Sequence, residues 1–420
     1  MKLDERSLDL LLPMDHPART VWAYVAGLDL SAFLAQIKAV AGRPGQSTID
    51  PRILLTLWML ATTEGIGSAR ALDRMTKFHI GYEWVCGDVS VNYHTLADFR
   101  SQNEELLNGL LTETVATLMQ QGLVELEEVA QDGMRVRASA GASSFRRKKS
   151  LDECLAKAKK QVEILKKQVD EDDGAVSRRQ QAAQVRGARE KQERIEEALR
   201  QREQLVQRQE QIKKERGSTK RPNEPRVSTT DPDARKMKMP DGGFRSAFNV
   251  EFATDTASGI IVGVDVVNVG SDSGQLLPMI EQLEERYEQT PDRVLADGDF
   301  ANLGDIETLH AEHDVDVYSP VKNAAKLEAE GVDPYKAKAK DKPGVGEWRE
   351  RMGTPEAKAI YKRRAQTAEW VNARARNMGL HQFRVRGLKK VLAVALMHAL
   401  TSNFVQTIRL KMLAATAAAA

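Results

Sequence analysis

Residues 244–270 read FRSAFNVEFATDTASGIIVGVDVVNVG, and this stretch decides the fold class. It holds two runs rich in β-branched and aromatic residues, separated by small and polar residues at 256–258, which predicts two strands joined by a turn. The other elements expected around this hairpin are strands at 124–140, 293–300 and 315–321 and helices at 273–289 and 302–313. Three leading strands followed by alternating helices and strands predict a mixed α/β sheet with helices on its faces.

The first 120 residues or so are expected to be helical. Asp50 and Pro51 are typical of a helix start, and that helix is expected to stop near Gly65. Ser68 and Thr95 are expected to open two further helices. Short helices separated by Gly-containing turns are typical of helix-turn-helix modules, although a generic helical subdomain has the same pattern.

Residues 144–226 separate the first expected strand from the rest of the sheet, and Phe145 is their one aromatic residue. Apolar residues in the first half recur at alternating steps of three and four, which predicts a heptad stripe along Leu155, Ala158, Val162, Leu165 and Val169. After a polar break at 170–177, a second helix carries Ile195, Leu199 and Val206. We therefore expect an antiparallel helical hairpin used for packing or oligomerisation, followed by a solvated linker at 214–226.

Composition excludes several classes of protein. The 62 Lys and Arg residues nearly balance 60 Asp and Glu residues, so a polyanion site requires local segregation of charge. Two distant cysteines exclude a disulfide framework or a thiolate zinc site and fit a reducing cytosol. Acids and a proline at residues 1–17 argue against a signal peptide, and no stretch reaches the roughly 18 apolar residues that a membrane span needs. The expectation is a soluble, cytoplasmic protein with no membrane partner.

Two aspartates stand at or near strand ends, each beside a glycine: Asp132 and Asp297. Carboxylates in such positions converge at one edge of an α/β sheet, where ligands bind. Hard divalent cations prefer oxygen ligands, and two such ions about 4 Å apart could serve the attacking and leaving oxygens of a phosphodiester. Asp299 lies two residues beyond Asp297 on the same face, so the pattern alone leaves both open.

The third acid is Glu369. Between Ala357 and the C terminus there are 12 Lys and Arg residues and one acidic residue, Glu369. It could pair with Lys362 and Arg376, which lie seven residues away on either side of it. Alternatively, it completes a metal site while the basic stretch holds a phosphate backbone. A rival acid, Glu356, beside Pro355, is explained by the dipole at a helix start.

Several segments, in their order along the chain, resemble bacterial insertion-sequence transposases of the DDE superfamily, in the branch with a separate N-terminal helical domain. The N-terminal fragments are STIDPRILLTLWMLATTEGIGSARALDRM (47–75) and YHTLADFR (93–100). The later ones are QDGMRVRASA (131–140), TDPDARKMKMPDGGFRSAFNV (230–250), VLADGDFA (294–301) and YKRRAQTAEWVNARARNMGLHQFRVRGLKK (361–390).

The resemblance implies an RNase H-like core with two Mg²⁺ ions, for which Mn²⁺ can substitute, held by Asp132, Asp297 and Glu369. It places Tyr361, Arg364 and Arg376 around that glutamate. Four residues separate Arg364 from Glu369 where the family usually has three. In a regular α-helix the extra residue rotates Tyr361 and Arg364 by about 100° relative to Glu369.

The resulting hypothesis is an α/β RNase H-like mixed sheet interrupted by an inserted helical hairpin, with an all-α N-terminal domain. The expected parts are a helical DNA-binding domain (1–122), a catalytic domain (123–143 and 227–408), the inserted hairpin and linker (144–226) and a tail (409–420). The residues expected to contact DNA are Tyr361, Lys362, Arg364, Arg376, Arg384, Arg386, Lys389 and Lys390.

The resemblance implies a nucleoid-associated homodimer on double-stranded DNA. This enzyme would bind terminal inverted repeats, cleave the element ends and join the freed 3′-hydroxyl to target DNA. The alternative function is a catalytically silent, transposase-derived DNA-binding regulator.

Overall fold

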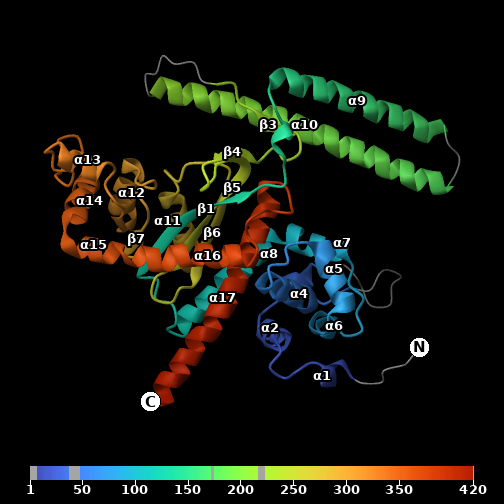
Figure 1. The fold of residues 1–420 in the computed structure, drawn as a ribbon, viewed down its shortest axis with the longest axis horizontal. Coiled ribbons are helices and arrows are strands. Elements are labelled where there is room, and N and C mark those ends of the chain that lie inside the picture. Colours follow the sequence, from blue (N-terminus) through green and yellow to red (C-terminus); the bar gives the residue numbers. More distant parts are fainter. Residues whose placement is uncertain (1–6, 37–47, 172–174, 216–222, 420) are drawn as a thin grey trace.

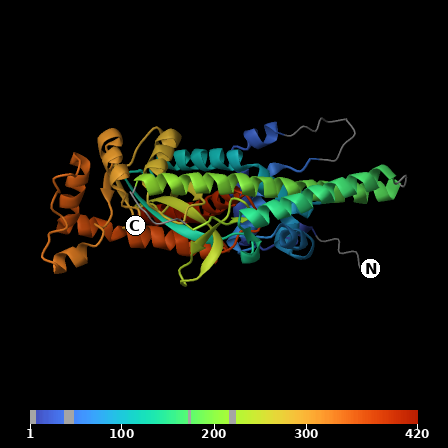
Figure 2. The same cartoon turned by 90° about the horizontal axis from the view of Figure 1, so that it is seen from above.

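The computed structural model describes residues 7–36, 48–171, 175–215 and 223–419. A helical N-terminal part lies beside a mixed α/β part, and a long helical hairpin runs along the top of both (Figure 1). Seen from above, this hairpin follows the long axis of the molecule (Figure 2).

The N-terminal part consists of α1 (Leu8–Leu11), α2 (Pro17–Ala26), α3 (Ser31–Ala35), α4 (Pro51–Thr63), α5 (Ala69–Phe78), α6 (Ile80–Cys86), α7 (Tyr93–Gln102) and α8 (Glu104–Gln120). Capping groups explain the expected starts. The Asp50 carboxylate accepts a hydrogen bond from the backbone N–H of Arg52 at 2.8 Å, and the Ser68 hydroxyl accepts one from Ala71. The α4 helix ends before Gly65, whose φ of 73° lies in the left-handed region that glycine adopts most easily.

Three details of the helical prediction are wrong. The cap of α7 is Asn92 rather than Thr95, because the Asn92 side chain accepts hydrogen bonds from the backbone of both His94 and Thr95. The helix expected from there to residue 121 is broken at Asn103, which has non-helical dihedral angles and whose amide donates to the Phe99 carbonyl at 2.7 Å. Likewise, α5 stops at Phe78 and a separate helix, α6, begins at Ile80.

The sheet contains β1 (Glu128–Arg137), β4 (Arg235–Lys238), β5 (Phe244–Asp255), β6 (Ile261–Val267), β7 (Arg293–Leu295) and β8 (Asp316–Tyr318). Its strands run in the order β6-β5-β1-β7-β8, and β4 pairs with the first residues of β5. Strand β5 is antiparallel to both β1 and β6, whereas β7 and β8 run parallel to β1. This mixed sheet is compatible with an RNase H-like fold.

The hairpin is inserted in the chain between β1 and β4. It comprises the 3₁₀ turn η1 (Ala142–Ser144), β2 (Phe145–Arg146), α9 (Lys148–Glu171), α10 (Ala175–Glu215) and β3 (Val227–Ser228), with β2 and β3 paired at its base. Of the expected heptad positions, Ala158, Val162 and Ile195 are buried. The remaining described ones are partly exposed, because two helices cover only one side of each other. The Val169 side chain and residues 172–174 and 216–222 lie outside the described part.

The remaining helices are α11 (Leu276–Tyr287), α12 (Leu303–His313), α13 (Ala324–Ala329), α14 (Pro343–Gly353), α15 (Pro355–Tyr361), the π-helical turn η2 (Ala365–Glu369), α16 (Trp370–Asn377) and α17 (Leu388–Ala419). The sequence analysis missed α13 and α14. Trp348 anchors α14, because its side chain is 1% exposed and its indole N–H donates to the Ser319 carbonyl at 3.0 Å.

Helix α17 corrects the expectation that no stretch is long and apolar enough to span a membrane. Residues Leu388–Thr416 pass that test by length and composition, and 78% of the most apolar window is buried inside the protein. The burial follows from packing, since α17 contacts α4, α7 and α8 of the N-terminal part and β6 of the sheet. A helix enclosed on most sides is expected to be apolar around most of its circumference.

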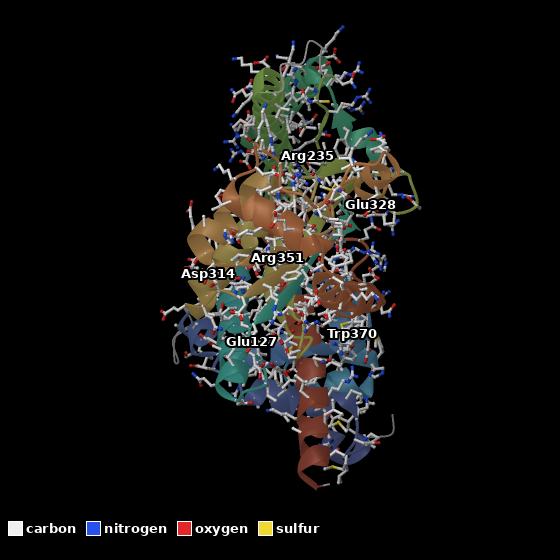
Figure 3. All side chains as sticks on the ribbon, turned by 90° about the vertical axis from the view of Figure 1, so that its left-hand side faces the viewer. Glu127, Arg235, Asp314, Glu328, Arg351 and Trp370 are labelled. Carbon is white, nitrogen blue, oxygen red and sulfur yellow. The ribbon has the colours of Figure 1, made fainter. Side chains whose placement is uncertain are left out.

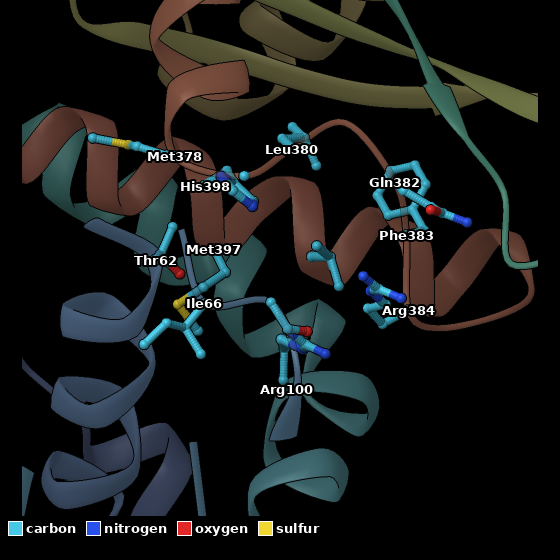
Figure 4. A pocket seen from close by; sticks show the side chains of 13 residues that line it. Thr62, Ile66, Arg100, Met378, Leu380, Gln382, Phe383, Arg384, Met397 and His398 are labelled. Atoms are coloured by element: carbon cyan, nitrogen blue, oxygen red, sulfur yellow. The ribbon is translucent and has the colours of Figure 1, made fainter. Parts of the chain in front are cut away.

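The N-terminal helices and α17 meet at a small cavity (Figure 4). Arg100 points into this seam, where its guanidinium lies 3.8 Å from the Trp58 ring centroid and donates to the Gly67 carbonyl at 3.1 Å. His398 lines the same cavity, and complete burial lowers its pKa to about 3. The two parts are thus joined by buried polar groups as well as apolar contacts.

Candidate active site

Asp132 and Asp297 are brought together by the register of two parallel strands. Ala130 pairs with Leu295, so each aspartate lies two residues beyond the same pair. Side chains alternate along a strand, so residues two positions apart point to the same face of the sheet. Asp132 lies in the middle of β1, whereas Asp297 follows the end of β7.

Asp299 takes a different position from its rival Asp297. Its side chain is exposed, and its backbone N–H donates to the Asp297 carboxylate at 2.8 Å. The Ser319 hydroxyl, just beyond β8, donates to the Asp297 carbonyl at 2.7 Å and holds this turn against the sheet. Of the two aspartates, Asp297 is the one that shares the Arg364 guanidinium with Asp132.

The third acid reaches the site through a π-helical turn. Residues Ala365–Glu369 form η2 between α15 and α16, so one wide turn contains the extra residue between Arg364 and Glu369. The expected rotation of Arg364 away from Glu369 is therefore wrong, and an Arg364 Nη1 atom lies 3.5 Å from Glu369 Oε1. The alternative pairing of Glu369 with Lys362 or Arg376 does not occur in the described residues.

Arg364 lies among all three acids. Its Nη2 atom is 3.1 Å from Asp132 Oδ1 and 3.7 Å from Asp297 Oδ2, in addition to the Glu369 contact. The exposed fraction rises from 10% for the Arg364 side chain to 16% for Asp132, 36% for Asp297 and 62% for Glu369. These four side chains are therefore buried where they meet the sheet and open to solvent on the side of Glu369.

Opposing influences act on the Asp132 carboxyl. Burial raises its pKa, Arg364 lowers it, and the neighbouring charge of Asp297 raises it again. Asn372 opposes the burial, because its amide donates to Asp132 Oδ2 at 2.9 Å. Asn372 is 4% exposed. The sequence analysis missed this residue, although its position three residues after Glu369 places it on the same helix face.

Tyr361 lies at the edge of the same group. It is half-buried, and burial raises the pKa of its phenol while the nearby Arg364 guanidinium lowers it. Both Asp297 and Asp132 act on it electrostatically. The Tyr361 and Arg364 side chains therefore lie beside the carboxylates.

The other basic residues expected to bind DNA are exposed: Lys362, Arg376, Arg384, Arg386, Lys389 and Lys390. Lys389 is also paired with the N-terminal part, since its Nζ atom is 2.9 Å from Glu105 Oε1. Arg386 donates to the Ser139 carbonyl beyond β1. Beside Glu369, Trp370 stacks against Arg374, whose guanidinium is 4.4 Å from the ring centroid; Figure 3 labels Trp370.

The donor set fits divalent cations by charge and by atom type. In the described part of the chain, no three His, Cys, Asp or Glu side chains already form a metal-holding group. Here the Arg364 guanidinium lies between the carboxylates and takes a cation's position. Three ionised carboxylates and one guanidinium leave two negative charges, and all the facing atoms are oxygens of the kind that Mg²⁺ prefers.

Comparison with known families identifies two matching regions. The family described as a transposase DDE domain matches residues 224–404, and a family described as a transposase domain matches residues 6–102. Asp297, Arg364 and Glu369 fall inside the first match, whereas Asp132 and the α9–α10 hairpin lie between the two. Neither the curated proteins nor the solved structures provide a match.

Proposed function

This chain belongs to the insertion-sequence transposases of the DDE type, and from that premise we propose that it cleaves and joins DNA at Asp132, Asp297 and Glu369. It would bind the terminal inverted repeats of its element, hydrolyse the phosphodiester at each end and use the freed 3′-hydroxyl to attack target DNA. The proposal also includes an RNase H-like fold for the catalytic domain and the domain limits that the sequence analysis expects.

One observation carries the proposal. Carboxylates from β1, from the loop after β7 and from the helical segment at 365–369 converge on one guanidinium, although they are 165 and 72 residues apart in sequence. Buried ion pairs alone are weak evidence for function. This group is different because its carboxylates become more exposed towards Glu369, which leaves room for a ligand.

Asp132, Asp297 and Glu369 would hold two Mg²⁺ ions, with Mn²⁺ able to substitute. Bound there, the ions would activate the attacking oxygen and stabilise charge on the leaving oxygen. Three carboxylates and one phosphodiester carry four negative charges, which two divalent cations balance. Arg364, displaced from the carboxylates, would donate to a phosphate oxygen in the bidentate geometry that guanidinium favours.

The remaining residues would position the substrate. Asn372 keeps Asp132 Oδ2 engaged and so leaves Oδ1 directed at the site. The exposed Lys362, Arg376, Arg384 and Lys390 would contact backbone phosphates, a role that supplies affinity without sequence selectivity. Two element ends must be held together for transfer, so we propose a homodimer acting on double-stranded DNA in the nucleoid.

The test uses three single variants: Asp132→Asn, Asp297→Asn and Glu369→Gln. Each removes one negative oxygen ligand with little change of shape, so Mg²⁺-dependent cleavage of end DNA should fall by about 10²–10³-fold or more. Binding of that DNA in a gel-shift assay should remain. The matched control is Asp299→Asn, an exposed neighbour of Asp297, which should cleave at nearly the wild-type rate.

Retained cleavage in any of the three variants would remove that residue from the site. If the wild-type protein shifts end DNA but leaves a supercoiled plasmid intact in both Mg²⁺ and Mn²⁺, the chain is a DNA-binding regulator instead.

A further inference from the structure

The excess positive charge of this chain lies in the hairpin. Helices α9 and α10 contain 18 Lys and Arg residues against 12 Asp and Glu residues, whereas the whole chain has 62 against 60. The rest of the chain therefore carries more acidic than basic residues. Side chains project from the hairpin on all visible sides at the top of Figure 3. A polyanion approaching the protein would be drawn towards this element.

A groove of about 340 Å³ lies where the hairpin meets the α/β part. Its polar lining comes from four segments of the chain: Lys157 on α9, Lys191 and Arg194 on α10, Thr229 and Thr230 after β3, and Arg386 before α17. Among the described residues, no carboxylate lines it. Four cations and two hydroxyl groups around one groove are the donor set that binds phosphate oxygens.

The protein itself does little to neutralise these cations. In the part of the chain that the structure describes, Lys157 and Lys191 make no ion pair, and both are exposed. Arg194 lies 4.0 Å from Glu190, at the limit of an ion pair. The charge of Arg386 acts on the Asp231 carboxyl, but that carboxyl is fully buried, and burial raises its pKa to about 6.

We propose that this groove binds the sugar–phosphate backbone of duplex DNA held at the three acids. The inference rests on the proposed function. Arg386 donates to the Ser139 carbonyl, two residues beyond the end of β1. From Asp132 to that end the strand spans about 17 Å, roughly half a turn of B-form DNA. One duplex can therefore cross the acids and reach the groove.

The contact is to backbone and not to bases. From residue 146 to 226 the sequence has no aromatic side chain to stack on a base, and the groove residues that can donate hydrogen bonds from N–H or O–H groups are Lys, Arg and Thr. Such contacts fix the orientation of DNA without reading its sequence. The hairpin would thus serve as a clamp on the flank of the cleaved end.

The test compares two double variants of the full chain. Lys157→Ala with Lys191→Ala removes two groove cations, whereas Arg208→Ala with Lys214→Ala removes two exposed α10 cations that do not line the groove. Kd for duplex end DNA is measured by fluorescence anisotropy over a range of salt concentrations. The groove variant should reduce the slope of log Kd against log salt by about 2 and raise Kd by about tenfold or more near 0.15 M salt. The control should change Kd by less than about twofold.

Cys154 provides a second readout, because it lines the groove while the other cysteine, Cys86, is buried. Bound DNA should slow alkylation of Cys154 by a maleimide. The idea is overturned by equal slopes in the groove variant and the wild type, by equal effects of both double variants, or by DNA-independent Cys154 alkylation. It is also overturned if the groove variant changes only the oligomeric state. A wild-type protein that does not bind DNA overturns the proposed function as well.

Discussion

Two groups of carboxylates lie on opposite faces of the same strands, β1 and β5. On one face, Asp132 meets Asp297, Glu369 and the Arg364 guanidinium. On the other, Glu251 lies next to Gly133, since those two residues are paired across the strands, and joins Asp272. Alternation along a strand explains how neighbours 132 and 133 serve different groups.

The two groups differ in what balances their charge. Glu251 and Asp272 are 1% and 8% exposed, and both accept a hydrogen bond of 2.6 Å from the same Asn249 amide. Burial raises the pKa of Glu251 well above its usual range, with the neighbouring Asp272 acting in the same direction. Arg135 pairs with Asp272 alone, whereas in the Asp132 group one guanidinium, that of Arg364, contacts all three acids and the group opens to solvent at Glu369.

The difference separates a structural polar cluster from a candidate site. In the buried pair, Arg135 reaches only Asp272, with its Nη2 atom 3.5 Å from Asp272 Oδ2, so burial favours a protonated Glu251. An open group can exchange its guanidinium for another cation. Gly133 lies between the two: a Cβ atom there would come within 2.9 Å of both Glu251 and Asp272, so only glycine fits beside Asp132 without displacing the cluster.

Among the variants that test this difference between the two carboxylate groups, Arg364→Ala is expected to have the largest effect. Loss of the guanidinium should reduce cleavage about 10²-fold, because a donor to the phosphate disappears. In EDTA the variant should also melt at a lower temperature than the wild type, since three carboxylates lose their shared cation. Adding Mg²⁺ should raise that melting temperature more than it does for the wild type, as followed by thermal unfolding. If Mg²⁺ raised the melting temperature of both proteins by the same amount, the guanidinium and the metal ion would not compete for one position between the carboxylates.

A smaller effect is expected for Asn372→Ala. The residue orients Asp132, so the variant should need about 10-fold more Mg²⁺ for half-maximal cleavage while binding DNA with unchanged Kd. Asn372→Asp places a second acid against Asp132 and should cleave more slowly than the alanine variant. Titrations of single-turnover cleavage against Mg²⁺ measure both. An unaltered Mg²⁺ requirement would limit Asn372 to packing.

The smallest effect on cleavage, within about twofold, is expected for Glu251→Gln in the sealed group. Its effect should be on stability. A carboxyl whose pKa is raised on folding binds more protons in the folded state, so it lowers stability as pH rises from its unfolded pKa to its folded one. The wild-type free energy of unfolding should therefore fall over this range above about pH 4.5, and the variant should lose part of that dependence. Urea titrations between pH 5 and 8 measure it; identical pH profiles would mean that Glu251 keeps its charge.

The sequence by itself determined the main strands, several helix starts and the positions of the acids along these elements. The β-branched runs gave β5 and β6, the Asp50-Pro51 and Ser68 caps gave the starts of α4 and α5, and the isolated acid in a basic stretch drew attention to Glu369. These features depend on local preferences and periodicity, which nearby residues set. Local patterns could not anticipate the break at Asn103, where one side chain competes with the helix backbone.

Only the tertiary structure decided how the acids meet. The turn at Ala365–Glu369 is π-helical, so Arg364 returns to Glu369, and the parallel register of β1 and β7 selects Asp297 to face Asp132. Asn372 reaches Asp132 across 240 residues of chain. Periodicity assigns a residue to a face of its own element, but the partner opposite that face is set by packing between elements distant in sequence.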